Sequence, residues 1–389
     1  MNSQPVTAPQ PTAAVIRLRC GTLTLHVEHA AMPLDELCTF GSRRNRKRGF
    51  LFISKVLGKH VPVRPSLMSR VHELLARQIA DVKGPVIVVA LAETAIGLGQ
   101  GIFEELLRQT SRDDMLFLHS TRYRLSKPLA LTFRESHSHA TEHLIYFPTD
   151  RRCRSIFDTA RTLLLVDDEL TTGRTVAHLA HEFSKINPGI DSIRFVSITD
   201  WLDAERRREL ADDFGRPVEF HQLLRGNFRF EANATFDPGP IPDVTGGGGL
   251  KDAWLCDNYG RLGVDGPIVI DGDRLERGAD LRAGDRVLVL GTGEFAHAPF
   301  LFARHLQRRG WDVHFQSTTR SPILVGEGIS CAQEFVDNYH DEIPNFVYNV
   351  AADRYDRILV GYETAPLPAS HRLLDLLGAQ PLFFGREAT

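Results

Sequence analysis

The sequence predicts an α/β protein of two lobes, each with a parallel sheet covered by helices. Its 389 residues are more than one hydrophobic core usually holds, so two domains are expected. Short apolar runs alternate with stretches whose apolar residues recur at helical spacing, which is typical of parallel strands joined by crossover helices. Between the two halves, residues 231–250 are rich in Pro, Gly and Asp and contain four consecutive glycines, which indicates a linker.

The individual elements follow from these patterns in chain order. Residues 1–12 are rich in Pro, Gln, Thr and Ala and are expected to be disordered. Apolar runs in the first lobe predict buried strands at 86–91, 115–119, 144–147, 163–166 and 192–199. Helical spacing predicts helices at 101–109 and 175–185. A second α/β pattern predicts strands at 286–290, 312–317 and 357–360. The expected domains are therefore 13–230 and 251–389.

Composition narrows the classes of function. A formal net charge of −3 does not favour binding to nucleic acid or to an anionic membrane. No run approaches the ~20 apolar residues that a membrane span needs, and the N-terminus lacks the pattern of a signal peptide. The five cysteines are scattered without a CxxC pair, which fits a reducing compartment. We therefore expect a soluble, cytoplasmic protein.

The stretch LLLVDDELTTGRT at 163–175 carries the clearest chemistry. Asp167 and Asp168 end a buried strand, where their carboxylates can accept hydrogen bonds from the vicinal hydroxyls of a ribose. A polar turn and a helix follow, so backbone N–H groups, hydroxyls and the positive end of the helix dipole can surround a phosphate. The residues of this turn are Thr171, Thr172, Gly173 and Thr175.

This stretch resembles the fingerprint of type I phosphoribosyltransferases: four apolar residues, two acidic residues, two loosely specified positions and a [TAD]TGxT turn. The resemblance implies a site for phosphoribosyl pyrophosphate (PRPP), with Mg²⁺ held by PRPP, Asp167 and Asp168. Family members that act on 6-oxopurines carry Asp where Thr171 stands, so hypoxanthine and guanine are disfavoured as acceptors. The alternative is a plain strand–turn–helix whose acidic pair caps the helix.

The resemblance implies two further loops in the first lobe. A pyrophosphate loop would follow the strand at 86–91 and consist of Ala92, Glu93, Thr94 and Ala95. A mobile loop at 122–143 would close over the reacting centre and exclude water. Its expected catalytic residues are Arg122, Lys127, His137 and His139. The alternative to the pyrophosphate loop is an ordinary βα turn. The alternatives to the mobile catalytic loop are a solvated basic loop and a zinc site at His137, His139 and His143 with Glu135 or Glu142.

A basic segment at 40–66 precedes these loops and concentrates Arg43, Arg44, Arg46, Lys47, Arg48, Lys55 and Lys59. In type I phosphoribosyltransferases a variable hood outside the common sheet selects the acceptor. A basic hood would suit an anionic acceptor or the phosphates of PRPP. A solvated charged face is the alternative.

Nearly the whole chain resembles a narrower family, the orotate phosphoribosyltransferase-like proteins of bacterial tellurite-resistance and stress gene neighbourhoods. Members carry a C-terminal domain named for the peptide TRSP, which stands here at 319–322. Other matching stretches are RNRKRGFLFISKVLGKHVPVRPS, ESHSHATEH, VLVLGTGEFAHAPF and DNYHDEIPNFVYNV. The resemblance implies a role in making a nucleoside-like compound and leaves the acceptor open.

The second lobe permits several interpretations. GTGEFA at 291–296 fits a dinucleotide-binding or methyltransferase glycine loop, but no acidic residue ends the next strand to hold ribose hydroxyls. The order of motifs also matches the first lobe, so we hypothesise a degenerate copy, in which VGYETAP lacks the acidic pair and glycine that PRPP needs. Thr319, Arg320 and Ser321 could bind an anionic ligand or hold the two lobes together.

We therefore expect a PRPP-dependent phosphoribosyltransferase with its active site in the first lobe. Its expected partners are two small molecules, PRPP and an unidentified nitrogenous acceptor. The sequence leaves open whether the chain also forms a homodimer. A PRPP-sensing regulator or scaffold without turnover is the alternative from another class. A nucleic-acid-modifying role is the weakest option.

Overall fold

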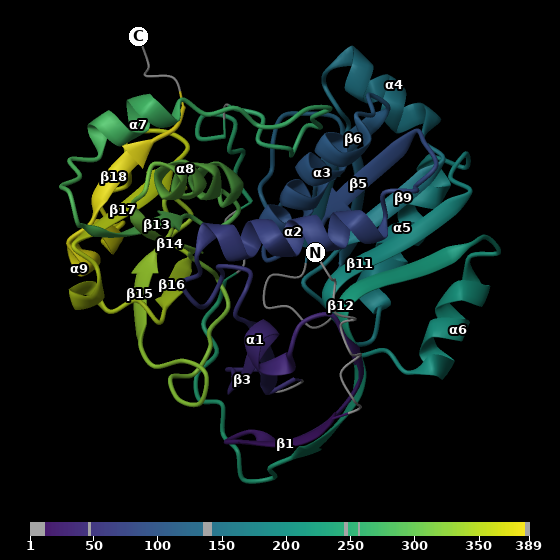
Figure 1. Ribbon diagram of the computed structural model, residues 1–389, viewed down its shortest axis with the longest axis horizontal. Coiled ribbons are helices and arrows are strands. Elements are labelled where there is room, and N and C mark those ends of the chain that lie inside the picture. The colour runs from purple at the N-terminus through teal and green to yellow at the C-terminus, as the bar shows by residue number, and fades with distance from the viewer. Residues whose placement is uncertain (1–11, 46–47, 135–141, 245–247, 256, 386–389) are drawn as a thin grey trace, which may run out of the picture.

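The computed structural model describes residues 12–45, 48–134, 142–244, 248–255 and 257–385. They form two lobes that lie side by side, the first purple to teal and the second green to yellow in Figure 1. Helix α2 (Pro65–Gln78) runs across both lobes and packs against α3 (Ile96–Thr110) in the first and α8 (His297–Arg308) in the second. Within the described residues, no helix is long and apolar enough to span a membrane.

One mixed sheet forms the frame of the first lobe. Its strands are β1 Thr12–Leu18, β2 Gly21–Ala30, β5 Val86–Ala90, β6 Met115–His119, β9 Thr162–Val166, β10 Glu169–Leu170, β11 Ser192–Asp200 and β12 Val218–Ala232. The parallel part has the order β6, β5, β9, β11, β12, with the short β10 beside β11. Strand β12 then pairs antiparallel with β2, and β2 with β1. The predicted parallel sheet is confirmed, and an antiparallel edge is added to it.

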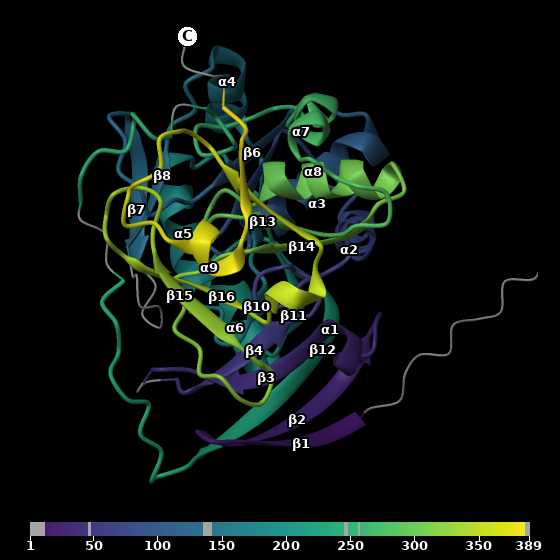
Figure 2. The same ribbon diagram turned by 90° about the vertical axis from the view of Figure 1, so that its left-hand side faces the viewer.

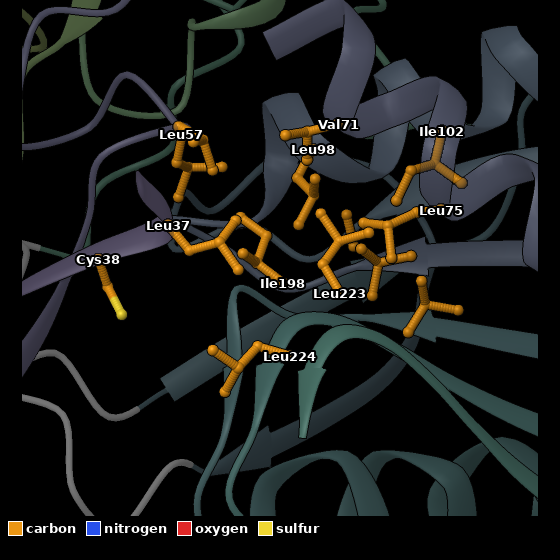
Figure 3. Packing of buried hydrophobic residues seen from close by; sticks show 14 of the residues in the cluster. Leu37, Cys38, Leu57, Val71, Leu75, Leu98, Ile102, Ile198, Leu223 and Leu224 are labelled. Atoms are coloured by element: carbon orange, nitrogen blue, oxygen red, sulfur yellow. The ribbon is translucent and has the colours of Figure 1, made fainter. Parts of the chain in front are cut away.

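Helices cover both faces of this sheet because its central strands are apolar on both sides. All five residues of β5 and of β9 are buried. Val88 belongs to the core under α2 and α3, and Val89 to the opposite core. The helices of that opposite core are α4 Arg151–Thr159, α5 Arg174–Ile186 and α6 Ala204–Asp213. Figure 3 shows the first core, where Leu75 of α2 and Ile102 of α3 lie over Leu223 of the sheet.

Two hairpins stand outside the main sheet. The strands β7 (Leu129–Arg134) and β8 (Glu142–Tyr146) form one, so the strand predicted at 144–147 belongs to this hairpin. The strands β3 (Cys38–Ser42) and β4 (Phe50–Ser54) form the other. This hairpin and α1 (Leu34–Leu37) belong to the hood, which comprises the described residues 34–45 and 48–64. Figure 2 shows β3 and β4 beside the long antiparallel strands β2 and β12.

The second lobe has its own, smaller sheet. Its elements are α7 Gly272–Gly278, β13 Arg286–Gly291, α8, β14 Asp312–Ser317, β15 Ala332–Val336, β16 Pro344–Tyr348, the 3₁₀ turn η1 Ala352–Arg354, β17 Arg357–Tyr362, α9 Leu373–Leu377 and β18 Gln380–Phe383. The parallel strands have the order β14, β13, β17, β18, and β15 and β16 form a separate hairpin. The three strands predicted here are all present.

The two lobes share one strand order. In the first, β6, β5, β9 and β11 lie side by side, and in the second, β14, β13, β17 and β18 do so in the corresponding sequence order. In each lobe a hairpin is inserted between the second and third of these strands along the chain. Unrelated strand orders would have excluded a degenerate copy, and the orders agree.

The segment between the lobes is attached to the first sheet. Phe117 of β6 exchanges two backbone hydrogen bonds with Val264, at 2.8 and 3.0 Å. Strand β12 continues to Ala232, two residues into the stretch that the composition assigned to the linker. The proposed domain bounds otherwise stay a prediction.

Candidate active site

The predicted PRPP loop lies where β9 ends and α5 begins. Asp167 donates its backbone N–H to Val196 of β11 at 3.0 Å, and Asp168 donates to the Asp167 side chain at 3.0 Å. Both carboxylates are half-buried at the carboxyl edge of the parallel sheet. This edge is the usual ligand site of open α/β sheets. The pair therefore stands where ribose hydroxyls could reach it.

A glycine turns the chain from this strand into the helix. Gly173 precedes α5 and has φ of +65°, in the left-handed region. The Arg206 side chain donates to the carbonyl of Thr172 at 3.0 Å and fixes the turn from outside. The first N–H groups of α5 have no partner within the helix, so they can meet an anion held in this turn.

We expect Gly173→Ala to lower the free energy of unfolding by about 1–3 kcal/mol and to weaken PRPP binding. The left-handed backbone disfavours a side chain, and the new Cβ would lie 2.6 Å from Leu210 Cδ1. Gly215→Ala is the matched control, because Gly215 has φ of +57° but open space around it. Denaturant unfolding and PRPP titration measure both effects. Equal losses in the two variants, with PRPP affinity intact, would contradict this role for Gly173.

The predicted pyrophosphate loop follows β5 on the same edge. The Ala92 N–H donates to Ser120 Oγ at 2.8 Å, and the Ala92 carbonyl accepts from the Arg122 guanidinium at 3.3 Å. The bond between Ala92 and Glu93 is a cis peptide. Ala95 is fully buried at the start of α3, so it supports the loop from beneath.

One pocket joins these loops. Its walls come from the PRPP loop at 167–176, from 91–94 with Arg122, from the hood residues Arg43, Arg48, Leu51 and His60, from Val244, and from 319–321 of the second lobe. Every predicted PRPP-contacting residue lines it, as do Ala92, Glu93 and Thr94. The sequence motifs thus meet in one cavity.

The hood reaches the PRPP loop through Arg48. Its guanidinium lies 2.5 Å from Glu169 Oε1 and 3.5 Å from Thr171 Oγ1, and it stacks on the Phe50 ring at 4.8 Å. Burial lowers the pKa of His60 to about 3, so its imidazole is neutral. Its buried Nε2 has no hydrogen-bond partner among the described residues. The hood therefore presents both a cation and a neutral hydrogen-bonding ring.

The four predicted catalytic residues have different positions. Arg122 lines the pocket, whereas Lys127 is exposed and outside its lining. His137 and His139 lie outside the described residues. His143, part of the zinc interpretation, is fully buried, with its Nδ1 2.9 Å from Ser120 Oγ. His143 is thus tied to the loop that carries Arg122.

The second lobe contributes to this pocket, which the sequence did not indicate. Thr319, Arg320 and Ser321 were expected to form a ligand site in the second lobe or to join the lobes, and they line the same pocket as the predicted PRPP loop. Thr319 exchanges backbone hydrogen bonds with Phe346 at 2.7 and 2.9 Å, and the Arg44 N–H donates to the Pro322 carbonyl. The TRSP peptide is thus held between the hairpin β15–β16 of the second lobe and the hood.

A buried group of charges lies behind the pyrophosphate loop. Glu93 Oε1 is 2.6 Å from Lys59 Nζ, and Glu93 Oε2 is 4.0 Å from Arg320 Nε. Burial opposes ionisation, but Lys59 and Arg320 hold the pKa of Glu93 below its usual range. Burial raises the pKa of Glu294, whose carboxylate accepts from Thr121 Oγ1 at 2.5 Å and from the Arg122 N–H at 2.7 Å.

The glycine loop GTGEFA at 291–296 is part of this interface. Lys59 donates to the Gly293 carbonyl at 3.1 Å, and Glu294 faces the first lobe. All six residues are buried, and none lines the pocket. The loop therefore contacts the other lobe where a dinucleotide or methyl donor would have to lie.

Two family models match the chain in succession. Residues 37–227 match a family described as phosphoribosyl transferase. Residues 272–377 match the TRSP domain, described as C-terminal to that phosphoribosyltransferase domain. No curated protein matches the chain.

Solved structures similar to the chain include several phosphoribosyltransferases. The adenine enzyme of Trypanosoma brucei is 12% identical, with 49% of this chain and 77% of that chain covered and a TM-score of 0.34. The adenine enzyme of Giardia lamblia is 15% identical, with 50% and 97% covered and a TM-score of 0.33. The orotate enzyme of Francisella tularensis is 16% identical, with 49% and 82% covered and a TM-score of 0.29.

The family models and the fold identify the same architecture. The first model covers the parallel strands and the predicted PRPP loop, and the second covers most of the lobe that carries the TRSP peptide. The chain therefore belongs to the family in which a type I phosphoribosyltransferase domain is followed by a TRSP domain.

Proposed function

We propose that this enzyme transfers the phosphoribosyl group of PRPP to a nitrogen atom of a small acceptor and releases pyrophosphate, in the cytoplasm. One observation carries the proposal: the PRPP loop, residues 92–94, the hood and 319–321 line a single pocket. A phosphoribosyl donor and its acceptor must be held together for transfer, and such a pocket provides that proximity.

Each wall of the pocket has a role in this proposal. Asp167 and Asp168 accept hydrogen bonds from the ribose hydroxyls. The turn at 171–175 and the start of α5 bind the 5′-phosphate through N–H groups and hydroxyls. The loop at 92–95 binds pyrophosphate. Arg122, beside this loop, offsets the negative charge that develops on the pyrophosphate as it leaves.

The reaction is a displacement at the anomeric carbon. The acceptor nitrogen forms a bond to this carbon, the bond to the pyrophosphate oxygen breaks with its electron pair, and the acceptor proton passes to a base or water. The paired carboxylates Asp167 and Asp168 fit Mg²⁺, which prefers carboxylate and phosphate oxygens. When bound with PRPP, Mg²⁺ supplies positive charge to the departing pyrophosphate.

The hood limits the class of acceptor. Arg43 and Arg48 line its side of the pocket with neutral His60, which favours an acceptor with an anionic group and a hydrogen-bonding edge. Thr171 takes the position of the acidic residue of 6-oxopurine enzymes, so hypoxanthine and guanine are disfavoured. The tellurite-resistance and stress neighbourhoods of similar proteins support a product that is a nucleotide or nucleoside-like compound.

Titration calorimetry with PRPP and Mg²⁺, followed by pyrophosphate release with a panel of nitrogenous acceptors, tests the proposal. We expect PRPP binding and release that depends on one class of acceptor. Replacing both carboxylates, as Asp167→Asn with Asp168→Asn, should weaken PRPP binding about 100-fold or more, because two charge-assisted hydrogen bonds are lost.

Asp191→Asn is the matched control for this loss. Asp191 lies before β11, away from the pocket lining, in an exposed pair with Arg161 at 2.7 Å. It should bind PRPP like the wild type. Binding without release on any acceptor would instead indicate a PRPP sensor, and no binding at all would reject the proposal.

A further inference from the structure

Hydrogen bonds establish which residues of the two lobes correspond. In the first lobe, Ser120 Oγ accepts from the Ala92 N–H at 2.8 Å. In the second, Thr318 Oγ1 accepts from the Gly293 N–H at 2.9 Å. Ser120 also donates its backbone N–H to the carbonyl of Ala90 in β5, and Thr318 donates its backbone N–H to the carbonyl of Gly291 in β13. The two βα loops are therefore built in the same way.

This correspondence pairs two glutamates and two arginines. Glu93 follows Ala92, and Glu294 follows Gly293, the residues whose N–H groups bind the hydroxyls. Arg122 stands two residues after Ser120, and Arg320 stands two residues after Thr318. The residue before each arginine makes a backbone bridge to the hairpin of its own lobe: Thr121 pairs with Leu144, and Thr319 pairs with Phe346.

Each glutamate faces the arginine loop of the opposite lobe. Glu294 accepts from Thr121 and from the Arg122 N–H, and Glu93 lies 4.0 Å from Arg320 Nε. Reciprocal contacts of this kind define an isologous interface, in which residue i meets residue j and j meets i. The second lobe therefore contacts the first through corresponding loops, and residues 319–321 form part of the pocket wall.

We propose that Arg320 is a positioning residue of the PRPP site, which acts from the second lobe by holding Glu93 and with it the pyrophosphate loop. This inference rests on the proposed function and adds a role for the TRSP peptide. The Arg320 guanidinium lies over the Tyr123 ring at 5.1 Å and is 7% exposed, so it has little freedom to move elsewhere.

The electrostatics of Glu93 support this role. Burial opposes the charge on Glu93, and the nearby cations Lys59, Arg320 and Arg122 lower its pKa and keep the carboxylate ionised. Without Arg320, Glu93 keeps only Lys59 as an ion-pair partner among the described residues. The pyrophosphate loop would then lose one of the contacts that fix its shape.

Titration of PRPP into the purified full chain tests the proposal through three variants. We expect Arg320→Gln to raise the dissociation constant of PRPP about tenfold or more, and Arg320→Lys to recover most of that loss. In a Glu93→Gln background, Arg320→Gln should change PRPP affinity less than about twofold, since the residue through which it acts is already altered.

Thermal unfolding of each variant separates positioning from simple attachment of the lobes. If Arg320→Gln lowers the melting temperature but binds PRPP with wild-type affinity, Arg320 only joins the lobes and the proposal is wrong. Equal loss of affinity in the wild-type and Glu93→Gln backgrounds would also overturn it, because Arg320 would then act on the ligand directly. If Arg320→Gln does not fold, Arg320→Met in the same two backgrounds decides by the same criterion, because it also removes the charge.

Arg286→Gln is the control, since Arg286 is a half-exposed arginine of the second lobe outside the pocket lining. It should retain wild-type affinity. Failure of the proposed function gives a different result, in which the wild type itself does not bind PRPP.

Discussion

Arg261→Ala is expected to lower the free energy of unfolding by about 3–5 kcal/mol, because it leaves the Glu363 carboxylate buried without its cation. The Arg261 guanidinium binds Glu363 through two hydrogen bonds, at 2.6 and 3.0 Å, and both side chains are only 1% exposed. The Tyr339 hydroxyl donates to the same carboxylate at 3.1 Å. This pair joins the segment along the first sheet to the end of β17, so its loss should loosen both lobes.

Denaturant unfolding followed by circular dichroism measures the loss, with Arg286→Ala as the matched control. Arg286 pairs with Asp356 at 3.0 Å in the same lobe, but both side chains are about half exposed. Such a pair contributes about 1 kcal/mol or less. Arg261→Met with Glu363→Leu should recover most of the stability, since neither charge remains buried. Similar losses in Arg261→Ala and Arg286→Ala would contradict the argument from burial.

The parts of the site that the sequence predicted are those encoded locally. A continuous apolar run, two carboxylates and the turn at Gly173 follow each other within 163–175, so neither the strand nor the helix start depends on distant contacts. The alternation of strands and helices predicted the parallel sheet in the same way. The antiparallel edge could not be predicted locally, because β12 pairs with β2, about two hundred residues earlier in the chain.

The charges behind the pyrophosphate loop show why the rest could not be predicted. Lys59 belongs to a basic run, and such runs usually lie on a solvated face. Its ammonium is instead buried against Glu93 and the Gly293 carbonyl, 34 and 234 residues away. The sequence likewise did not decide whether Arg320 binds a ligand or joins the two lobes. Burial of a charge is settled by partners that folding brings together, and local spacing carries no record of them.

Acidification from pH 7 to pH 5 is expected to lower the free energy of unfolding by about 4 kcal/mol. Burial lowers the pKa of His60, His72 and His119 to about 3 in the folded chain. An unfolded histidine titrates near 6.5, so below that pH the unfolded chain binds protons that the folded chain rejects. Each residue accounts for about 2 kcal/mol of lost stability at pH 5. Asp200 offsets about 1 kcal/mol, because burial raises its pKa to about 6 and the folded chain gains its proton first.

Urea unfolding at several pH values measures this slope, and His72→Gln should reduce it. The His72 ring packs against Gly101 and, at 5.5 Å, against Phe300 of the second lobe, where burial and the nearby Arg304 disfavour a positive charge. Removing this one titration should reduce the loss to about 2 kcal/mol. His178→Gln is the control, because His178 of α5 is about half exposed, and it should keep the wild-type slope.

PRPP should offset part of the acid effect, because a ligand that binds only the folded chain stabilises it. His60 lines the pocket, and its carbonyl accepts from Asn349 of the second lobe at 2.9 Å. A ligand at 100 times its dissociation constant stabilises the folded chain by about 2.7 kcal/mol, so saturating PRPP should recover more than half of the loss at pH 5. A stability that stays flat between pH 7 and pH 5 would mean that these imidazoles accept protons in place, which requires water or carboxylates to reach them. A loss that saturating PRPP cannot reverse would mean that the folded chain does not bind PRPP at pH 5.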